Sequence, residues 1–432
     1  RYQQEGRGDP TPRGTAGMIA RFCAYSALRN LRFFEPFLVL FLLHDVGLTF
    51  LAVGALLAYE KVLCGLLEVP LGVVNDRFGR RRGLVAAFVL TALAFGAFAG
   101  ATQAPDGWKL VLLYGAQTLY AVGEALRTGT HKAMILDWLQ RQGRRDEKTR
   151  VMGITRFWSK TSGGVSALAA GVLVWTTGSF TLLFVAACLP TLAAAVVVWS
   201  YPRELEGMRA ATPAAEATPR PRLAGLVGAG VVPMLLASVV FESQIKLALV
   251  YLQPFLAGAL GTADLAVMGG VGAMVFGGWY FVQGLLAGAS SLGATWLVAR
   301  AGSEAGAVIA ANRAALLGMV GVLVWRSTGW QAPALVCFLA FAALQNARRP
   351  IFVSALDDVM DPAYRATTLS IESQARSWAY AGSAVVMGAL ADAGGLVAAF
   401  AGMAALLALV VVRLPRLRGD AAWLTGDRPP AT

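Results

Sequence analysis

The sequence predicts an all-α membrane protein with twelve transmembrane helices arranged as two six-helix, pseudo-symmetric bundles. Three observations lead to this fold class: the composition, a series of long apolar segments, and motifs that recur in the two halves of the chain. Of the 432 residues, 57% are hydrophobic and only 14% are charged, whereas about 25% of the residues of a soluble domain are charged. The composition therefore favours helices that are surrounded by lipid.

Long apolar segments follow one another along the chain. Residues 84–101, 182–199 and 396–412 lack the polar face of a soluble amphipathic helix, and about 18 apolar residues are enough to cross a bilayer. Twelve spans fit the sequence, at approximately 18–43, 49–71, 83–103, 109–139, 151–175, 180–200, 224–258, 267–299, 304–325, 332–356, 366–391 and 395–414. They divide the chain into an N-terminal tail (1–17), a first bundle (18–200), a linker (201–223), a second bundle (224–414) and a C-terminal tail (415–432).

The cationic residues predict the orientation. With both termini in the cytoplasm, almost every Lys and Arg outside the spans lies on the inner side, and only Lys109 and Arg326 lie outside. This distribution follows the positive-inside rule and predicts a multi-pass protein of the cell inner (plasma) membrane. The formal net charge of +12 is explained by this orientation, so we expect no nucleic-acid partner.

The two halves resemble each other on either side of the linker, which is rich in Pro, Ala and charged residues. The first span contains Glu35-Pro36-Phe37, and the seventh contains Gln253-Pro254-Phe255. Leu-Asp pairs end the fourth and tenth spans, at Asp137 and Asp357, with almost the same offset. A six-plus-six repeat places a solute site between two halves that rock about it.

The loop between spans two and three, residues 72–82, reads GVVNDRFGRRR. Gly72 and Gly79 allow a tight turn and close helix approach, Asp76 can face a helix N-terminus, and Arg80 can pair with a carboxylate on a neighbouring helix. Arg81 and Arg82 are interpreted as anchors to anionic lipid.

This loop resembles the signature loop of the major facilitator superfamily: Gly, three residues, Asp-Arg, one residue, Gly, and two basic residues. The resemblance implies a two-bundle transporter that works by alternating access. It also implies a cytoplasmic gate or latch, for which the candidate residues are Gly72, Asp76, Arg77, Gly79, Arg80 and, as the partner of Arg80, Asp137. Drug–proton antiporters of this family carry a Gly-Pro pair in span five, which is absent here, so drug efflux is not supported. The segment 129–139, GTHKAMILDWL, is similar to a little-described bacterial branch.

Charged residues inside the spans are the main functional signal, because each costs about 2.5–3.5 kcal/mol at the centre of a membrane helix. Arg32 and Glu35, Glu124 and Arg127, Glu242 and Lys246, and Glu372 and Arg376 are three or four residues apart. Such pairs share a helix face. One interpretation is therefore purely structural: neutral pairs, among them Glu60–Lys61 and Glu372–Arg376, that hold helices together.

The resemblance implies that spans one, four, seven and ten line the cavity, and cations outnumber acids in these spans. The predicted substrate-binding residues are Arg29, Arg32, Glu35, Glu124, Arg127, Glu242, Lys246 and Arg348. Because guanidinium groups suit carboxylates and phosphates, we expect a small anionic or zwitterionic solute. Glu35, Glu124 and Glu242 are the candidates for proton coupling, since a proton-coupled cycle needs a group that changes its charge.

Other function classes are disfavoured. No phosphate-binding Gly-x-x-x-x-Gly-Lys-Ser/Thr loop occurs, so ATP is not expected to drive transport. We expect no cofactor, no metal site and no catalytic residue. His44 and His131 are the only histidines, and neither belongs to the set of nucleophile and base that a lipid-modifying enzyme needs. The expected partners are a small-molecule solute and the lipid bilayer, with the protein a monomer. The alternatives are a non-transporting membrane sensor or scaffold with this fold, and a lipid-moving transporter.

Overall fold

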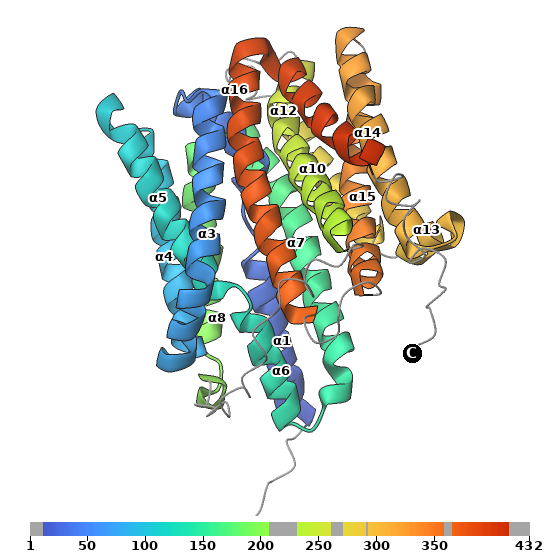
Figure 1. Ribbon diagram of the computed structural model, residues 1–432. Coiled ribbons are helices and arrows are strands. Elements are labelled where there is room, and N and C mark those ends of the chain that lie inside the picture. Colours follow the sequence, from blue (N-terminus) through green and yellow to red (C-terminus); the bar gives the residue numbers. More distant parts are fainter. Residues whose placement is uncertain are drawn as a thin grey trace, which may run out of the picture.

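The computed structural model describes residues 12–206, 231–260, 271–290, 293–329, 331–357 and 365–413, and among them it contains helices and turns but no strand (Figure 1). In chain order the α-helices are α1 (Pro12–Leu28), α2 (Leu38–Leu40), α3 (Phe50–Phe78), α4 (Arg80–Ala101), α5 (Asp106–Arg127), α6 (Thr130–Arg141), α7 (Lys148–Thr177), α8 (Thr181–Trp199), α10 (Val231–Ala259), α12 (Val271–Ser290), α13 (Ala294–Ala301), α14 (Glu304–Ser327), α15 (Gln331–Asp357) and α16 (Arg365–Arg413). Short 3₁₀ or π segments are η1 (Glu35–Phe37), η2 (Phe41–Asp45), η3 (Arg145–Glu147) and η4 (Arg203–Glu206).

These elements form the twelve expected spans. Two of the spans are the parts of α16 on either side of a bend at Gly394 and Gly395, where Gly395 has φ 68°. Seven of the described helices are each long and apolar enough to cross a membrane. The prediction of an all-α membrane protein with two six-helix bundles is confirmed.

Two spans that were expected to be continuous are broken. The first span leaves the helix at Leu28 and resumes as short turns from Glu35, because Pro36 has no N–H and disfavours a helical residue before it. The fourth span is interrupted between α5 and α6, where Gly129 has φ 78°, a conformation that only glycine adopts readily. Both breaks lie next to predicted site residues.

We call the end where α3 meets α4 the loop end, and the end where α16 bends the distal end; they are at the bottom and the top of Figure 1. The halves are packed against each other through α3 with α16 and α7 with α12. At the distal end they share one apolar core, to which Phe37 and Phe184 contribute from the first half and Phe255 and Phe276 from the second.

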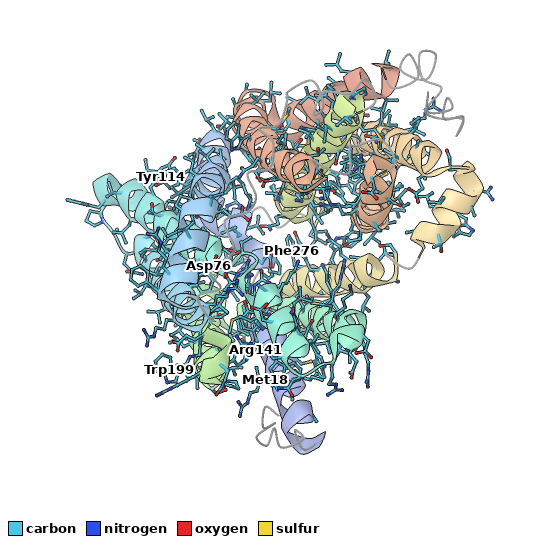
Figure 2. All side chains as sticks on the ribbon, turned by 60° about the horizontal axis from the view of Figure 1, so that its bottom comes forward. Met18, Asp76, Tyr114, Arg141, Trp199 and Phe276 are labelled. Atoms are coloured by element: carbon cyan, nitrogen blue, oxygen red, sulfur yellow. The ribbon has the colours of Figure 1, made fainter. Side chains whose placement is uncertain are left out.

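At the loop end each half has an apolar cluster of its own. One is built around Phe22 and Trp138 and the other around Met234 and Phe352. Figure 2, viewed from the loop end, shows the two bundles beside each other with α12 against the first half. The molecule is therefore joined at the distal end and divided at the loop end.

The predicted linker begins as a packed segment. Tyr201 is buried, and Glu206 forms an ion pair with Arg82 at 2.9 Å. Arg81 is also buried and donates to the carbonyl of Tyr201 at 3.1 Å. The interpretation of Arg81 as a lipid anchor is therefore wrong, because its guanidinium holds the end of the sixth span. Residues 207–223 of the linker, 1–11 of the first tail and the tail 415–432 lie outside the described residues.

Candidate functional site

Two adjacent hollows lie between the halves. The central cavity, about 510 Å³, is lined by both halves, including Arg32, Glu35, Lys61, Lys160, Gln253 and Tyr280. The second hollow, here called the vestibule, has a volume of about 1040 Å³ and extends to Asp357 and Leu369 at the loop end. Lys160 lines both hollows, so it lies at their junction.

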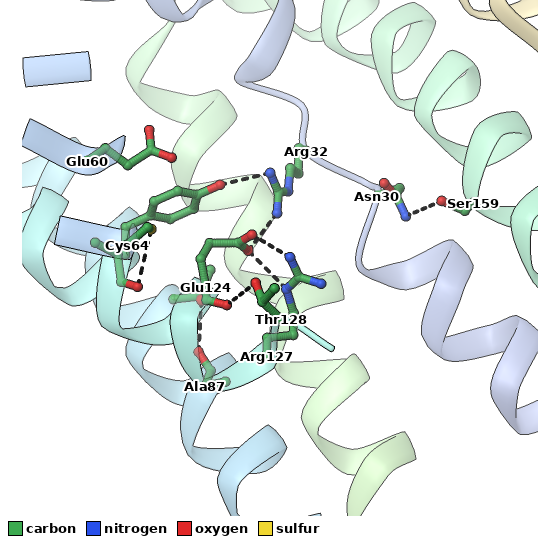
Figure 3. A network of polar contacts seen from close by, with 12 residues as sticks. Asn30, Arg32, Glu60, Cys64, Ala87, Glu124, Arg127, Thr128 and Ser159 are labelled. Atoms are coloured by element: carbon green, nitrogen blue, oxygen red, sulfur yellow. Dashed lines mark hydrogen bonds and ion pairs between the residues drawn. The ribbon is translucent and has the colours of Figure 1, made fainter. Parts of the chain in front are cut away.

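A cluster of arginines fills the space beside the two helix breaks (Figure 3). Arg32 donates to Glu124 at 2.9 Å and to the hydroxyl of Tyr120 at 2.8 Å. Arg127 also donates to both oxygens of Glu124. Residues 29–34 have left the helix, so Arg32 extends towards α5 and joins this cluster. The spacing of Arg32 and Glu35 predicts a pair between them, but this pair does not form.

Arg29 belongs to the same cluster. Its Nε is buried and has no hydrogen-bond partner among the described residues, and it lies within electrostatic range of Arg127 and Glu124. Two guanidinium groups thus pair with a single carboxylate and a third lies near it, so the cluster carries an excess of positive charge. Nearby His131 stacks on Tyr25 and contacts the hydroxyl of Tyr201 at 3.1 Å, which is a structural role.

The remaining cavity charges of the first half differ in their pairing. Lys61 donates to Glu60 at 2.6 Å, and Glu60 also accepts from Gln117 at 3.1 Å, so the predicted neutral pair is present. The side chains of Glu35 and Lys160 are both exposed to the cavity, and neither forms an ion pair with another described residue. Lys160 was not among the predicted site residues, although two cations four residues apart in span five, Arg156 and Lys160, were a visible signal.

Glu372 organises the charges of the second half. It accepts from Arg349 at 2.8 and 3.1 Å, from Arg376 at 2.8 Å, and from Ser238 at 2.8 Å. Glu242 makes only long contacts, to Lys246 at 3.6 Å and to Gln345 at 3.4 Å. Glu242 is 3% exposed and lies within electrostatic range of Lys246 and Arg348, so it is a buried carboxylate near cations but without a close ion pair among the described residues.

Arg348 is not where the sequence predicts it. Its side chain is fully buried and lines neither hollow. The guanidinium carbon lies 4.3 Å from the ring centre of Phe241 and 5.1 Å from that of Phe352, and none of its nitrogens has a hydrogen-bond partner among the described residues. Helix periodicity placed Arg348 and Arg349 in one span, but only packing decides that Arg349 faces the vestibule.

The signature loop lies at the surface of the first half. Arg80 donates to Asp76 at 3.1 Å and to Asp137 at 2.5 Å, so its contacts join spans two, three and four within one half. Gly79 has φ 104°, which explains the glycine at this turn. No atom of the described residues comes within 4 Å of a Cβ built at Gly72, so close helix approach does not explain that residue in this conformation. Arg77 is exposed and makes no ion pair among the described residues.

Two residues that sequence reasoning passed over connect the halves. The carboxylate of Asp392 accepts from the N–H groups of Phe50 and Leu51, both at 2.8 Å, at the N-terminus of α3. Gln253 accepts from the N–H of Val39 at 2.7 Å and donates to the carbonyl of Glu35 at 2.9 Å. It thereby satisfies backbone groups that the break in the first span leaves free.

Glycines allow the helices of the two halves to touch at the distal end. A Cβ at Gly277 of α12 would lie 2.7 Å from the carbonyl oxygen of Ala167, and one at Gly171 of α7 would lie 2.7 Å from that of Ala273. On the other seam, a Cβ at Gly54 would lie 2.1 Å from the carbonyl oxygen of Ala384. Small residues at such crossings are typical of helix packing in membranes.

Comparison with known proteins agrees with this architecture. A family model described as Major Facilitator Superfamily matches residues 17–382. No curated protein matches the sequence. Among solved structures, the nucleoside transporter NupG is 10% identical with a TM-score of 0.70, the alignment covering 93% of this chain and 99% of that one.

Two further solved structures share the fold. A bacterial homologue of the human lysosomal transporter Spinster, in its inward-facing and unoccupied conformation, is 16% identical with a TM-score of 0.69, with 98% and 100% of the two chains covered. A D-xylose–proton symporter is 14% identical with a TM-score of 0.68, with 96% and 99% covered. Likeness at these identities extends to the fold alone.

Proposed function

This chain belongs to the major facilitator superfamily of membrane transporters, and from that premise we propose that it is a secondary active transporter. It moves a small anionic or zwitterionic solute across the bacterial inner membrane by alternating access, in which the two halves rock about a site between them. Structures with this fold include a nucleoside transporter and a D-xylose–proton symporter, so the substrate class has to be argued from the residues of this chain.

We propose that the protein is a monomer with both termini in the cytoplasm, and that the loop end is its cytoplasmic end. The positive-inside rule supports this orientation, because Arg80, Arg81 and Arg82 lie at that end. The vestibule then opens to the cytoplasm, and the described conformation is inward-facing. The shared core at the distal end and the separate clusters at the loop end support the same conformation.

The observation that carries the proposed solute class is the excess of cations around the two hollows. Among the described residues, the cations that line them are Arg32, Lys61, Arg156, Lys160, Lys246, Arg349 and Arg376, and the acids are Glu35, Glu60, Glu242 and Asp357. Seven cations face four acids, and behind them Arg29 and Arg127 outnumber Glu124. Such a surface favours a solute with a carboxylate or phosphate group.

Proton coupling is proposed through Glu35 or Glu242. Glu124 is less suited than the sequence alone indicates, because protonating it would leave Arg32 and Arg127 without their common acceptor. Glu35 is exposed in the cavity, and Glu242 is buried with only long contacts. Either carboxylate can therefore gain or lose a proton without breaking a close ion pair.

Transport in proteoliposomes tests the proposal. Labelled anionic and zwitterionic metabolites are offered with and without an inward pH gradient, and at least one is expected to accumulate faster than in protein-free vesicles. One of the two variants Glu35→Gln and Glu242→Gln is expected to remove the effect of the gradient, whereas Asp146→Asn, an exposed site at the loop end, should keep it. If the unmodified protein takes up solute at the same rate with and without the pH gradient, proton coupling is excluded but transport is not.

We also propose that Asp76, Arg80 and Asp137 act as a latch when the loop end closes. Asp76→Asn weakens a largely exposed contact, and exposed ion pairs contribute about 0.2–1 kcal/mol. We expect uptake to slow by about two- to fivefold, with solute affinity unchanged. Arg141→Gln, at an exposed position near the same end, is the control. Loss of affinity in Asp76→Asn would contradict the latch.

A further inference from the structure

The charges that face the central cavity separate into a paired group and an unpaired group. Arg32 is committed to Glu124 and Tyr120, and Lys61 is committed to Glu60. Both cations therefore already have a close acceptor, although Arg32 shares Glu124 with Arg127. Only two charged side chains among the described residues that line this cavity remain without an ion pair, and these are Glu35 and Lys160.

Glu35 and Lys160 have opposite charges and face the same space. Glu35 is on the first span, immediately after its break, and Lys160 is on α7. Both are exposed and lie within electrostatic range of each other without forming an ion pair. Arg156 also lies within range of Lys160, and Arg32 within range of Glu35. Gln253 fixes the backbone at Glu35 by donating to its carbonyl, so this carboxylate is held at the cavity wall by a contact from the other half.

The rest of the wall is largely apolar. The half-buried residues Leu38, Leu249 and Val250 line the cavity. The rings of Phe34 and Phe184 also lie at its wall but are buried, and they stack at 4.6 Å between ring centres. Tyr280 and Gln283 of α12 add polar groups from the second half. The volume of about 510 Å³ is in the range of small-molecule sites, about 300–1,000 Å³.

We propose that the solute of this cavity is a zwitterion with an apolar part, in the class of amino acids and short peptides. Its carboxylate binds the ammonium group of Lys160, its ammonium group binds the carboxylate of Glu35, and its apolar part lies against Leu38, Leu249 and Val250. A solute with only negative charge would meet the unpaired carboxylate of Glu35, and a solute with only positive charge would meet Lys160. This inference rests on the proposed function and narrows its solute class.

The cationic vestibule is compatible with this assignment. It lies between the central cavity and the loop end, where Arg156 and Lys246 line it together with Lys160. A positive field there attracts the carboxylate end of a zwitterion first, so the solute enters with that end near Lys160. The excess of cations in the vestibule then attracts the solute, while Glu35 and Lys160 in the central cavity select it.

Binding to the purified full-length protein tests the proposal with matched compounds. The probes are the common amino acids and their dipeptides, each compared with an analogue that lacks the amino group and one that lacks the carboxylate. Affinity is measured by thermal shift and calorimetry. At least one zwitterion is expected to bind at least about tenfold more tightly than both of its analogues, since a hydrogen bond to a charged group is worth about that factor.

Two variants assign the ends of the solute. Glu35→Gln should remove the preference for the zwitterion over the analogue without an amino group, and Lys160→Gln should remove the preference over the analogue without a carboxylate. Glu204→Gln and Lys148→Gln, at exposed positions outside the hollows, are the charge-matched controls and should keep both preferences. If Glu35→Gln instead removed the preference over the analogue without a carboxylate, the assignment of the two ends would be wrong. The same holds if Lys160→Gln removed the preference over the analogue without an amino group.

The two proposals fail in different ways. If no zwitterion binds better than its analogues, or if a compound without an amino group binds equally well, the zwitterion proposal is wrong. Should such an acid nevertheless be taken up by proteoliposomes, the transporter proposal stands and only the solute class changes. Absence of uptake for every compound that binds would instead count against transport while leaving the binding result intact.

Discussion

Gly277→Leu is expected to prevent closure of the distal end and to stop transport. A side chain at this position meets the carbonyl oxygen of Ala167 at 2.7 Å and the Cα of Gly171 at 3.3 Å. These are backbone atoms, so the contact is relieved only when α7 and α12 separate. Overpacking costs about 1–3 kcal/mol, which shifts a conformational equilibrium by roughly 5- to 150-fold. Because α7 and α12 belong to different halves, their separation disfavours the conformation described here, in which the two helices touch.

The adjacent glycine provides a matched control. In the part of the chain that the structure describes, nothing lies within 4 Å of a Cβ at Gly278, so Gly278→Leu should transport at the normal rate. Spin labels on the distal ends of α7 and α12 measure the separation directly, and uptake is measured in the same preparations. A distance distribution for Gly277→Leu that matches the unmodified protein would show that the glycine contact is not required for closure.

Arg32→Ala is expected to abolish solute uptake and to destabilise the first half. It removes the only described hydrogen-bond partner of the Tyr120 hydroxyl and one of the two guanidinium groups on Glu124. A hydrogen bond to a charged group contributes about 1.5–3 kcal/mol. Because both partners belong to the protein, the loss lowers the stability of the first half and disturbs the wall of the central cavity, which Arg32 and Tyr120 line. Arg127 keeps Glu124 partly compensated, so we expect the protein to fold with a lower melting temperature.

A conservative variant separates charge from geometry. Arg32→Lys keeps the positive charge but cannot reach Tyr120 and Glu124 with separate nitrogens of one planar group. We expect intermediate uptake for Arg32→Lys and normal uptake for Arg141→Ala, which changes an exposed arginine near the loop end. Unchanged uptake in Arg32→Ala would rule out a role for the arginine cluster in transport.

Several local features could be predicted because they depend on neighbours in the sequence. Glu124 and Arg127 are three residues apart and pair across one helical turn, as do Glu372 and Arg376 at four residues. Gly79 ends α3 with a positive φ, as expected for a glycine in a tight turn. These outcomes follow from helix geometry alone.

The same rules failed where two helices compete for one group. Arg32 and Glu35 have the spacing of a helical pair, but the break before Pro36 removes the helix on which that spacing depends. Arg348 and Arg349 are neighbours in sequence, yet one is buried between phenyl rings and the other pairs with Glu372. Asp392 and Gln253 have functions only because the other half supplies their partners.

The sequence by itself determined the fold class, the number of spans, the repeat and the loop at residues 72–82, because hydropathy and motif spacing are properties of the chain. The tertiary structure decided which charges are available to a solute. Ion pairing in a membrane protein is settled by contacts between helices that are far apart in the chain, such as Arg32 with Glu124. The pair left over, Glu35 and Lys160, is visible only after every other cavity charge has found its partner.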